Sequence, residues 1–569
     1  MSIDVWLIIP IALVLYFLLY FGYGRFLERK VVKVDAAAVT PAHRLYDGID
    51  YVPSNKFVIF GHHFASIAGA GPILGPTMAM AWGWIPAFLW VIFGNALIGA
   101  VHDYLSLMAS VRYDGKSVAF VAEKAIRPRT RYIFSIYIWF ALVLVVAAFI
   151  ITTATAFVGI PESATPSILF CPIALLFGII LYRVGLDLKV STVIGLFLVF
   201  ASVWVGYYIP LPLAFTEWVF ILSIYAWMAA FLPVWYLLQP RDYLNAYLLW
   251  FGLGFGGIAL LLAAPPLVMP AFTSFTMTVV GGKPSPWWPT VVLVIACGAL
   301  SGFHSLVSSG TSSKQIDKET DALFIGYGGM FFEGFLSVIV VASLGAYLLS
   351  LPAAAGDLSK AISYAVATPL PAFTGSYGLA LNKAFGIAPK IGAIFATLWV
   401  SAFVLTTLDT ANRLARFVFV ELMAPVEKAS KGAYRAVSNR IFASLLCAVV
   451  GGLLAGTGAY TYIWPAFAGT NQLLAALAMM TVSAWVVGVL KLPKRICAWI
   501  LVPTIFLLVT VTVALFWYLF VVAAPLMFVA GREALGVSLT VISVIMLVLD
   551  ILLIADFSAT CRKHWAAGA

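Results

Sequence analysis

Residues 57–80 read FVIFGHHFASIAGAGPILGPTMAM, an apolar run long enough to cross a membrane. Three glycines and two prolines fall within residues 69–76. Proline removes a backbone donor and glycine lowers helix stability, so we expect the helix to unwind near its middle. Unwound backbone at membrane depth is tolerated only inside protein or beside a cavity, where its polar groups can bind a ligand. The stretch therefore predicts a transporter-type solute site, formed by Gly69, Ala70, Gly71 and Pro72.

The composition of the whole chain is that of a membrane protein. Its 569 residues are 63% hydrophobic and 10% charged, and the mean hydropathy is +1.05. Soluble domains are roughly 45–50% apolar and about 25% charged, so this chain has too few charges to cover a surface in water. The five cysteines show no metal-ligand spacing, and we interpret them as small hydrophobic residues without a disulfide framework.

A membrane helix needs about 20 mostly apolar residues, and on that criterion the chain contains fifteen spans. They are predicted at 4–23, 57–80, 84–110, 131–158, 167–184, 188–209, 216–238, 243–268, 289–309, 321–351, 389–416, 438–457, 461–490, 496–520 and 538–558. The predicted fold class is therefore an all-α integral membrane protein with about 15 transmembrane helices.

The distribution of charge tests this count, because inner loops of membrane proteins are richer in Lys and Arg than outer loops. If residue 1 lies outside, the segments that fall inside hold 28 of the 33 Lys and Arg residues. This excess predicts an outside N-terminus and a cytoplasmic C-terminus in a bacterial-type inner membrane. The same excess of basic residues in the inner loops, which lie beside membrane lipid, accounts for the net charge of +10. We therefore expect no nucleic-acid partner.

A second proline-interrupted span follows five spans after the first. The span at 216–238 contains Pro233 and, by the alternation of sides, crosses the membrane in the direction opposite to 57–80. Two opposed blocks of five spans are typical of the five-plus-five inverted repeat of LeuT-like symporters. On that hypothesis Pro233 and Tyr236 join the solute site. The alternative is that Pro233 is an ordinary kink in a membrane helix.

The inverted repeat implies a division of the chain into four parts. They are an N-terminal helix and cytoplasmic segment at 1–56, the first repeat at 57–209, the second repeat at 216–416, and about four extra C-terminal helices at 417–569.

Several polar strings in the chain resemble the carbon starvation protein A family over residues from about 40 to 480. The strings are YDGIDYVPSNK at 46–56, FGHHF at 60–64, GAGP at 69–72, VHDY at 101–104, SGFHS at 301–305 and TTLDTANR at 406–413. The resemblance implies uptake of peptides or pyruvate during nutrient limitation, and membership of the amino acid–polyamine–organocation superfamily.

Ionisable residues inside apolar spans are costly and usually mark a transport pathway or a buried pair. Those in the predicted spans are His62, His63, His102, Asp103, His304, Glu333 and Asp409. We assign His62 and His63 to the solute site because they precede the break, and the other five to proton coupling. Two alternatives stay open for the histidines: neutral donors to backbone carbonyls, or a metal centre, for which no helix-borne ligand spacing is present.

A row of serines predicts a cation site. Ser305, Ser308 and Ser309 share one helical face, and in the five-plus-five fold such hydroxyls hold sodium together with backbone carbonyls, here those of Ala65 and Ala68. Small residues that permit close helix packing are the alternative. We expect no organic cofactor and no resident metal, and either a bound sodium ion or a proton as the coupling ion.

Three further polar groups allow two interpretations each. Glu333 is either a proton relay or a hydrogen-bonded structural acid. Asp409 and Arg413 are spaced i, i+4, which favours an ion pair within one helix, or they form a gate. Asp47, Asp50 and Lys56 form an inner gate or a capped turn before the first broken span.

The function predicted from these patterns is secondary active transport of a small organic solute, a peptide or a pyruvate-like carboxylate, by cation-coupled alternating access. A membrane-embedded metal enzyme is one alternative, but the chain has no HExxH, no GxSxG and no nucleotide-binding loop, so we do not expect an enzyme. A sensor that binds the solute without transport is the other. The pattern carries no information on oligomeric state.

Overall fold

The computed structural model describes residues 4–456 and 460–566, and almost all regular structure in these ranges is helical. Eleven helices are long and apolar enough to cross a membrane, or up to thirteen if each of two bent helix pairs counts as one span. The predicted fold class of an α-helical membrane protein is therefore confirmed. The count of fifteen spans is not confirmed.

The helices of the first half are α1 (Val5–Leu19), α2 (Pro41–Arg44), α3 (Lys56–Ile67), α4 (Gly71–Ala79), α5 (Trp84–Leu89), α6 (Ala100–Arg112), α7 (Val118–Ala125), α8 (Pro128–Gly159), α9 (Ala164–Ile179), α10 (Leu188–Tyr208), α11 (Phe215–Phe231) and α12 (Leu238–Ala263). Tighter or wider helical turns continue several of these, so that α1 reaches Val32 and α5 and α6 form one span. A short antiparallel hairpin follows, β1 (Thr276–Thr278) with β2 (Pro284–Pro286).

The helices of the second half are α13 (Trp287–Val294), α14 (Gly302–Gly310), α15 (Gly328–Tyr347), α16 (Leu358–Ala367), α17 (Pro369–Phe385), α18 (Pro389–Leu422), α19 (Ala424–Ala429), α20 (Lys431–Val437), α21 (Arg440–Gly456), α22 (Tyr460–Ala484), α23 (Lys494–Trp517), α24 (Ala524–Leu526) and α25 (Glu533–Ala566).

The structure has the predicted break in the span at 57–80, where α3 and α4 are separated by three residues and bent by 45°. It differs from the prediction at the two spans that do not qualify as crossing helices. The span at 216–238 becomes the shorter α11, which ends two residues before Pro233 because proline disfavours helix in the residue before it. The span at 289–309 is not continuous, because residues 295–301 are not helical between α13 and α14.

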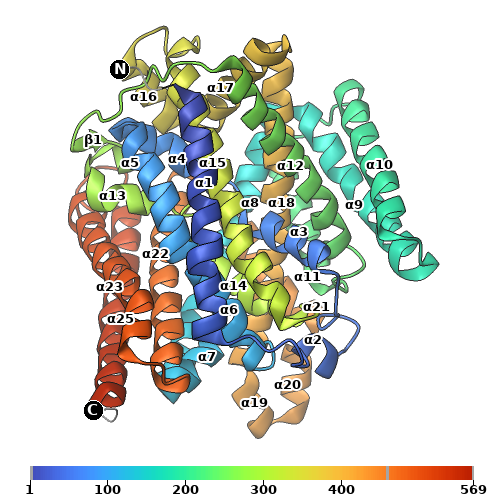
Figure 1. The fold of residues 1–569 in the computed structure, drawn as a ribbon, viewed down its shortest axis with the longest axis vertical. Helices are drawn as coiled ribbons and strands as arrows, with labels where there is room; N and C mark the ends of the chain where they lie inside the picture. The colour runs from blue at the N-terminus through green and yellow to red at the C-terminus, as the bar shows by residue number, and fades with distance from the viewer. Residues whose placement is uncertain (1–3, 457–459, 567–569) are drawn as a thin grey trace.

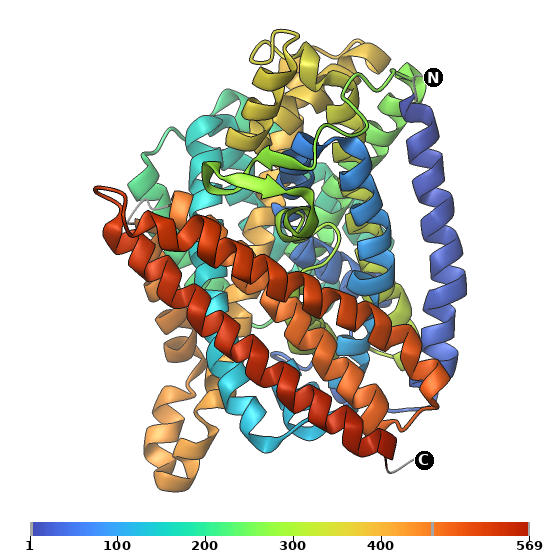
Figure 2. The same ribbon diagram turned by 90° about the vertical axis from the view of Figure 1, so that its left-hand side faces the viewer.

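Two helices far apart in sequence form the centre of the molecule. Helices α8 and α18 pack side by side. Helix α3 of the interrupted span α3–α4 and helix α14 of the interrupted span α13–α14 both contact α18. The α9–α10 hairpin stands at one edge (Figure 1), while α22, α23 and α25 form a layer at another edge that faces the viewer in Figure 2. The position of the broken helices in the interior explains why α3 is buried almost throughout despite its two histidines.

The two ends of the molecule hold different sets of loops. Helices α7, α19 and α20, which carry four of the Lys and Arg residues predicted to lie inside, are at one end, and α16, α17 and the β hairpin are at the other (Figure 1). Helix α1 begins at the second end and α25 finishes at the first. The structure thus separates the two sets of loops that the charge pattern assigns to opposite faces of the membrane.

We predict that cysteines placed at the two ends react from opposite sides of the membrane. Lys360 in α16 and Lys431 in α20 are both exposed, so Lys360→Cys and Lys431→Cys suit the measurement. A membrane-impermeant maleimide added to intact cells should label position 360 and spare 431, with the reverse in inside-out vesicles. Labelling of both positions from the same side would contradict the predicted topology.

Candidate functional site

The first break is held by side-chain hydroxyl groups that replace lost helix hydrogen bonds. Thr407 on α18 donates to the carbonyl of Ser66 (3.1 Å), and the Ser66 hydroxyl bonds to Thr410 (2.9 Å). Ser337 on α15 donates to the carbonyl of Pro72 (2.8 Å) on the other side of the break. Buried backbone polar groups need such partners, so the break is a supported element of the interior.

The second break, residues 295–301, is held in the same way. Asn95 donates to the carbonyl of Gly298 (3.0 Å). On α22, the Asn471 carbonyl oxygen accepts hydrogen bonds from the Phe303 amide (3.0 Å) and the Ser301 hydroxyl (3.1 Å), and Gln472 donates to the carbonyl of Val292 (3.0 Å). Both interrupted spans are therefore stabilised by polar side chains from neighbouring helices.

The two breaks touch each other. A Cβ added to Gly71 would lie 2.3 Å from Cys297 Cβ, and one added to Gly75 would lie 2.6 Å from the carbonyl oxygen of Val294. Only glycine permits this approach, because any side chain would overlap the opposite segment. The predicted solute-site residues Gly69, Ala70, Gly71 and Pro72 thus lie at the junction of the two unwound segments, which direct packing closes in this structure.

Two adjacent histidines on α3 connect it to the end of α14. His62 Nε2 is 3.2 Å from Thr311 Oγ1, and His63 Nδ1 is 2.9 Å from Ser312 Oγ. All four side chains are buried. Because α3 and α14 each belong to a broken span, these hydrogen bonds join the two half-helices directly.

Five ionisable side chains from four helices meet in what we call the histidine–carboxylate cluster: His63 of α3, His102 and Asp103 of α6, His304 of α14 and Glu333 of α15. His102 Nδ1 is 2.8 Å from Asp103 Oδ1. His304 Nδ1 lies 3.5 Å from Asp103 Oδ2 and 3.6 Å from Glu333 Oε2. His63 Nε2 completes the cluster at 3.9 Å from Asp103 Oδ2.

The cluster is buried and short of hydrogen bonds. All five residues have no exposed surface. Asp103 Oδ2, both carboxylate oxygens of Glu333 and one ring nitrogen of each of the three histidines have no hydrogen-bond partner. Unpaired charge in such an interior is costly, so protons shared among these groups stabilise it.

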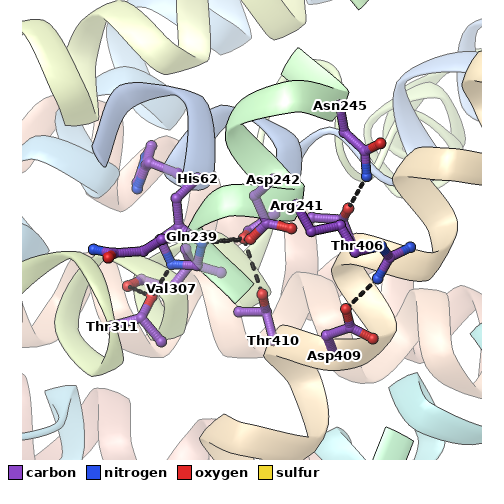
Figure 3. A network of polar contacts seen from close by, with 12 residues as sticks. His62, Gln239, Arg241, Asp242, Asn245, Val307, Thr311, Thr406, Asp409 and Thr410 are labelled. Carbon is purple, nitrogen blue, oxygen red and sulfur yellow. Dashed lines mark hydrogen bonds and ion pairs between the residues drawn. The ribbon is translucent and has the colours of Figure 1, made fainter. Parts of the chain in front are cut away.

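A second polar network joins α3 to α12 and α18. His62 Nδ1 lies 2.6 Å from Asp242 Oδ2 at the start of α12, and the next residue back, Arg241, forms an ion pair with Asp409 of α18. Tyr225 of α11 also bonds to Asp409. In Figure 3, His62 and Asp242 face each other while Arg241 turns toward Asp409. The network connects the broken first span to its neighbours through fully buried charges.

The serines of the predicted cation site make different hydrogen bonds. Ser305 donates to the carbonyl of Gly302, whereas Ser309 accepts from the amide of Val118 at the start of α7, and Ser308 Oγ has no partner. Ser66, which lies between Ala65 and Ala68 in the chain, bonds to Thr407 and Thr410 of α18. Of the three serines, only Ser309 bonds to another helix through its hydroxyl group.

The expected ion pair between Asp409 and Arg413 is wrong. Asp409 pairs with Arg241 instead, and Arg413 Nη1 donates to Asp50 Oδ1 (2.8 Å). Arg416 binds the same Asp50 carboxylate. Burial favours the neutral acid, but these guanidinium groups hold the pKa of Asp50 below its usual value. Asp50 thus fastens the segment before α3 to α18.

Four other predicted residues lie away from the breaks. Pro233 and Tyr236 stand in the loop between α11 and α12, where the carbonyl of Tyr236 packs against Gly178 of α9. Asp47 accepts hydrogen bonds from the amides of residues 49, 50 and 51, which is the capped-turn alternative, and the Lys56 ammonium sits over the ring of Phe57.

Sequence reasoning missed Asp242, Arg241, Asn471 and Gln472. Arg241 and Asp242 follow Pro240 at the start of an apolar run, and we counted them as part of a loop. Two adjacent opposite charges at a span boundary were the available signal. The two amide residues stand alone in an apolar span, and their role depends on residues some 170 positions earlier in the chain.

Two observations bear on other kinds of site. Within residues 4–456 and 460–566, no group of three or more His, Cys, Asp or Glu side chains is arranged to hold a metal ion. A cavity of about 770 Å³ lies between the span of α5 and α6, α13 and α23, lined by Trp90, Phe93, Trp287 and other apolar residues. Its apolar walls suit lipid chains, so we do not place a polar solute there.

The comparisons identify the family. The sequence profile of the carbon starvation protein CstA family matches residues 4–355 and 345–515. The chain belongs to this family. A peptide transporter CstA of Bacillus subtilis is 32% identical over 96% of this chain and 94% of its own length. The pyruvate/proton symporter BtsT of Escherichia coli is also 32% identical, over 90% of this chain and 81% of its own length.

The family's fold has a distant structural relative. The crystal structure of a manganese transporter from Eremococcus coleocola superposes with a TM-score of 0.50, covering 91% of this chain and 99% of that one at 12% identity. At that identity the likeness concerns the fold alone.

We predict that the contact between the two breaks tolerates no side chain at position 71. Gly71→Leu should insert into the membrane but abolish transport, because its side chain occupies the space of Cys297. The smaller Gly71→Ala should destabilise the protein by about 1–3 kcal/mol through overpacking. Thermal unfolding of the purified protein and solute uptake measure the two effects.

The matched control is Gly71→Ala combined with Cys297→Gly. Removing the Cys297 side chain leaves the next atom 3.6 Å from the new methyl group, so stability should return. Equal loss with and without Cys297→Gly would contradict the contact.

Proposed function

We propose that this chain is a proton-coupled symporter that takes up a small organic solute, a peptide or a pyruvate-like carboxylate, when carbon is scarce. The relatives named as a peptide transporter and as a pyruvate/proton symporter support the solute class. The observation that carries the proposal is the histidine–carboxylate cluster, which lies between both broken spans. The proposed location is the inner membrane, with the N-terminus outside and the C-terminus in the cytoplasm.

The chemistry of the cluster suits a proton as the coupling ion. Histidine changes charge near neutral pH, and a buried carboxylate beside it exchanges protons with it over a short distance. His304 stands between the two carboxylates of Asp103 and Glu333, so one ring can serve both. Because its members come from α3, α6, α14 and α15, loading with a proton changes the forces among the helices that contain the breaks.

Sodium is less favoured by the contacts. A sodium site needs several oxygen ligands that converge, whereas Ser305 bonds within α14 and Ser309 bonds to the start of α7. The threonines of α18 beside Ser66 already use their hydroxyl groups in hydrogen bonds to backbone and side chain. A proton needs no such set of converging ligands, which supports the assignment of coupling to His102, Asp103, His304 and Glu333.

We infer an inverted repeat whose two units differ from the blocks 57–209 and 216–416 predicted from the sequence. The first unit is α3–α4, α5–α6, α8, α11 and α12, and the second is α13–α14, α15, α18, α21 and α22, with the α9–α10 hairpin inserted in the first. Each unit opens with a broken pair, and the predicted alternation of sides gives the units opposite orientation.

The packing of the helices supports this division. Helix α12 packs on α3 as α22 packs on α14, and α11 packs on α18 as α21 packs on α8. The pairs α8–α18 and α11–α21 join equivalent members of the two units. The connecting helices also correspond, since α7 leads into α8 and α17 leads into α18. A pseudo-two-fold arrangement of this kind is the basis of alternating access.

The proposed cycle follows from these groups. The broken pairs with α6 and α15 rock against α8, α11, α18 and α21, and the junction of the two breaks opens to each side in turn. Small unwound segments adjust at low cost because side chains, and not helix hydrogen bonds, hold them. The free energy comes from the proton gradient, and no covalent step is involved.

We predict that Asp103→Asn and Glu333→Gln lose accumulation but keep exchange. In proteoliposomes with an imposed inward proton gradient, the unmodified protein should concentrate pyruvate or dialanine. The two variants should lower gradient-driven uptake by at least about tenfold, the size expected when a positioned proton-transfer group is lost, while solute counterflow without a gradient persists.

Asp550→Asn is the matched control, because Asp550 is also a buried carboxylate but lies in α25 with Thr512 as its partner. Its uptake should equal that of the unmodified protein. Full gradient-driven accumulation by both cluster variants would refute the coupling role.

A further inference from the structure

Helix α1 lies outside both units of the proposed repeat. It packs against α15 and stands, in dark blue, at one edge of the molecule in Figure 2. A cavity of about 550 Å³, which we call the α1–α15 groove, lies between these two helices. Pockets that bind small organic molecules measure roughly 300–1,000 Å³, so the groove is large enough for a ligand.

The walls of the groove are apolar and come from one face of each helix. They include Leu13, Phe17 and Phe21 on the side of α1, and Phe324, Phe331 and Phe332 on the side of α15 and the helical turn before it. The floor is buried, since Tyr16 is 4% and Phe331 8% exposed, whereas Phe17 and Phe21 on the rim are 63% and 53% exposed. Exposed apolar residues on a membrane helix face hydrocarbon, so the groove opens to lipid.

Contacts of α1 with its neighbours fix the width of the groove. Tyr16 donates to the carbonyl of Val91 (3.0 Å), and a Cβ added to Gly334 would lie 2.2 Å from the Tyr16 hydroxyl oxygen, so α1 touches α15 here. Further along α1, Tyr23 donates to the carbonyl of Trp499 on α23 (2.7 Å). Because α1 is held on two sides, the groove is formed before any ligand binds, which lowers the cost of binding.

One end of the groove is basic. Arg25 lines it there, at the end of α1 that the charge pattern assigns to the cytoplasm. Arg25 Nη1 donates to Glu28 (2.6 Å), but the arginine side chain is 38% exposed and a guanidinium has five N–H donors, so other donors remain for a ligand. Three exposed basic residues follow in the chain, Arg29, Lys30 and Lys33. This short segment thus contains four basic residues and one acidic residue.

The length of the groove matches one leaflet of a bilayer. Leu13 and Arg25 are twelve positions apart, which is about 18 Å along a helix that rises about 1.5 Å per residue. The hydrocarbon of one leaflet is about 15 Å thick, half of the core of a bilayer. A lipid with its headgroup at Arg25 can therefore extend an acyl chain along the groove as far as Leu13.

From these features we propose that the α1–α15 groove binds one anionic phospholipid of the cytoplasmic leaflet, with an acyl chain on the aromatic walls and the phosphate at Arg25. Basic pockets between membrane helices on the cytoplasmic side bind anionic headgroups, and a neutral lipid would leave the positive charge unbalanced. The larger cavity beside Trp90 has no charged side chain in its described lining, so it selects no headgroup. The lipid site goes beyond the proposed transport function and does not depend on it.

The lipid site lies behind one member of the histidine–carboxylate cluster. Phe331, Phe332 and Phe335 of α15 line the groove, whereas Glu333 of the same helix turns toward His304, at 3.6 Å. A bound lipid thus packs on the outer face of the helix that carries Glu333 on its inner face, and it joins α1 to that helix.

Gly328 allows a variant that fills the groove. It lines the groove, and a Cβ added there meets its nearest atom at 3.7 Å, so a side chain enters without displacing backbone. Native mass spectrometry with equal amounts of phosphatidylglycerol and phosphatidylcholine of the same acyl chains is the measurement. The parent protein should retain one phosphatidylglycerol at least about tenfold more often than phosphatidylcholine, and Gly328→Phe should lose it. Gly254→Phe is the control and should retain it, because position 254 on α12 is exposed with no atom within 4 Å of an added Cβ.

Two further variants separate the headgroup from the acyl chain. Arg25→Gln should still retain lipid but lower the preference for phosphatidylglycerol by about fivefold, the contribution of one basic side chain near an anionic lipid. Lys431→Gln, exposed on the side of the membrane predicted to be the same, should leave the preference unchanged. Gly328→Ala is too small to fill the groove and should bind lipid like the parent, which separates filling of the groove from a change in folding.

Three results would overturn the proposal. Equal retention of both lipids by the parent protein would contradict the anionic headgroup. An unchanged phosphatidylglycerol adduct in Gly328→Phe would contradict the location. A dimer of the parent that Gly328→Phe dissociates would show that a second copy of the chain covers the groove in place of lipid. These measurements use no solute, so they are independent of the uptake test.

Discussion

The structure depends on one constraint: backbone polar groups in the membrane interior must find partners inside the protein. Two spans are interrupted, and each interruption is satisfied by hydroxyl or amide side chains, Thr407 and Ser337 for the first, Asn95 and Asn471 for the second. Such bonds are made between helices and not within them. The unwound segments can therefore change partners when neighbouring helices move, which a continuous helix cannot do.

The polar groups next to the breaks divide into two sets. The histidine–carboxylate cluster joins helices that carry or adjoin the breaks, whereas His62 and Asp242 cross from α3 to α12. Adjacent residues on a helix point about 100° apart, so His62 and His63 face different networks while both bind the turn after α14. The two neighbouring histidines thus connect one short helix to two buried polar networks.

Local signals predicted part of this arrangement. Glycine and proline in residues 69–76 predicted the first break. Isolated ionisable residues in apolar runs marked all five cluster residues, four as candidates for proton coupling and His63 as a solute ligand. The second break was missed because residues 295–301 contain no proline and unwind through bonds to α22, a tertiary effect. The spacing in the sequence allowed Asp409 to pair with Arg413. Asp409 pairs with Arg241 instead, because Asp50, in the segment before α3, binds Arg413.

The central claim is that the solute binds where the two unwound segments meet. An experimental structure with saturating pyruvate or dipeptide tests it most directly. The account predicts the solute between residues 68–71 and 295–302, with Gly71 and Cys297 farther apart than in this structure. A solute bound elsewhere, with that contact intact, would contradict it.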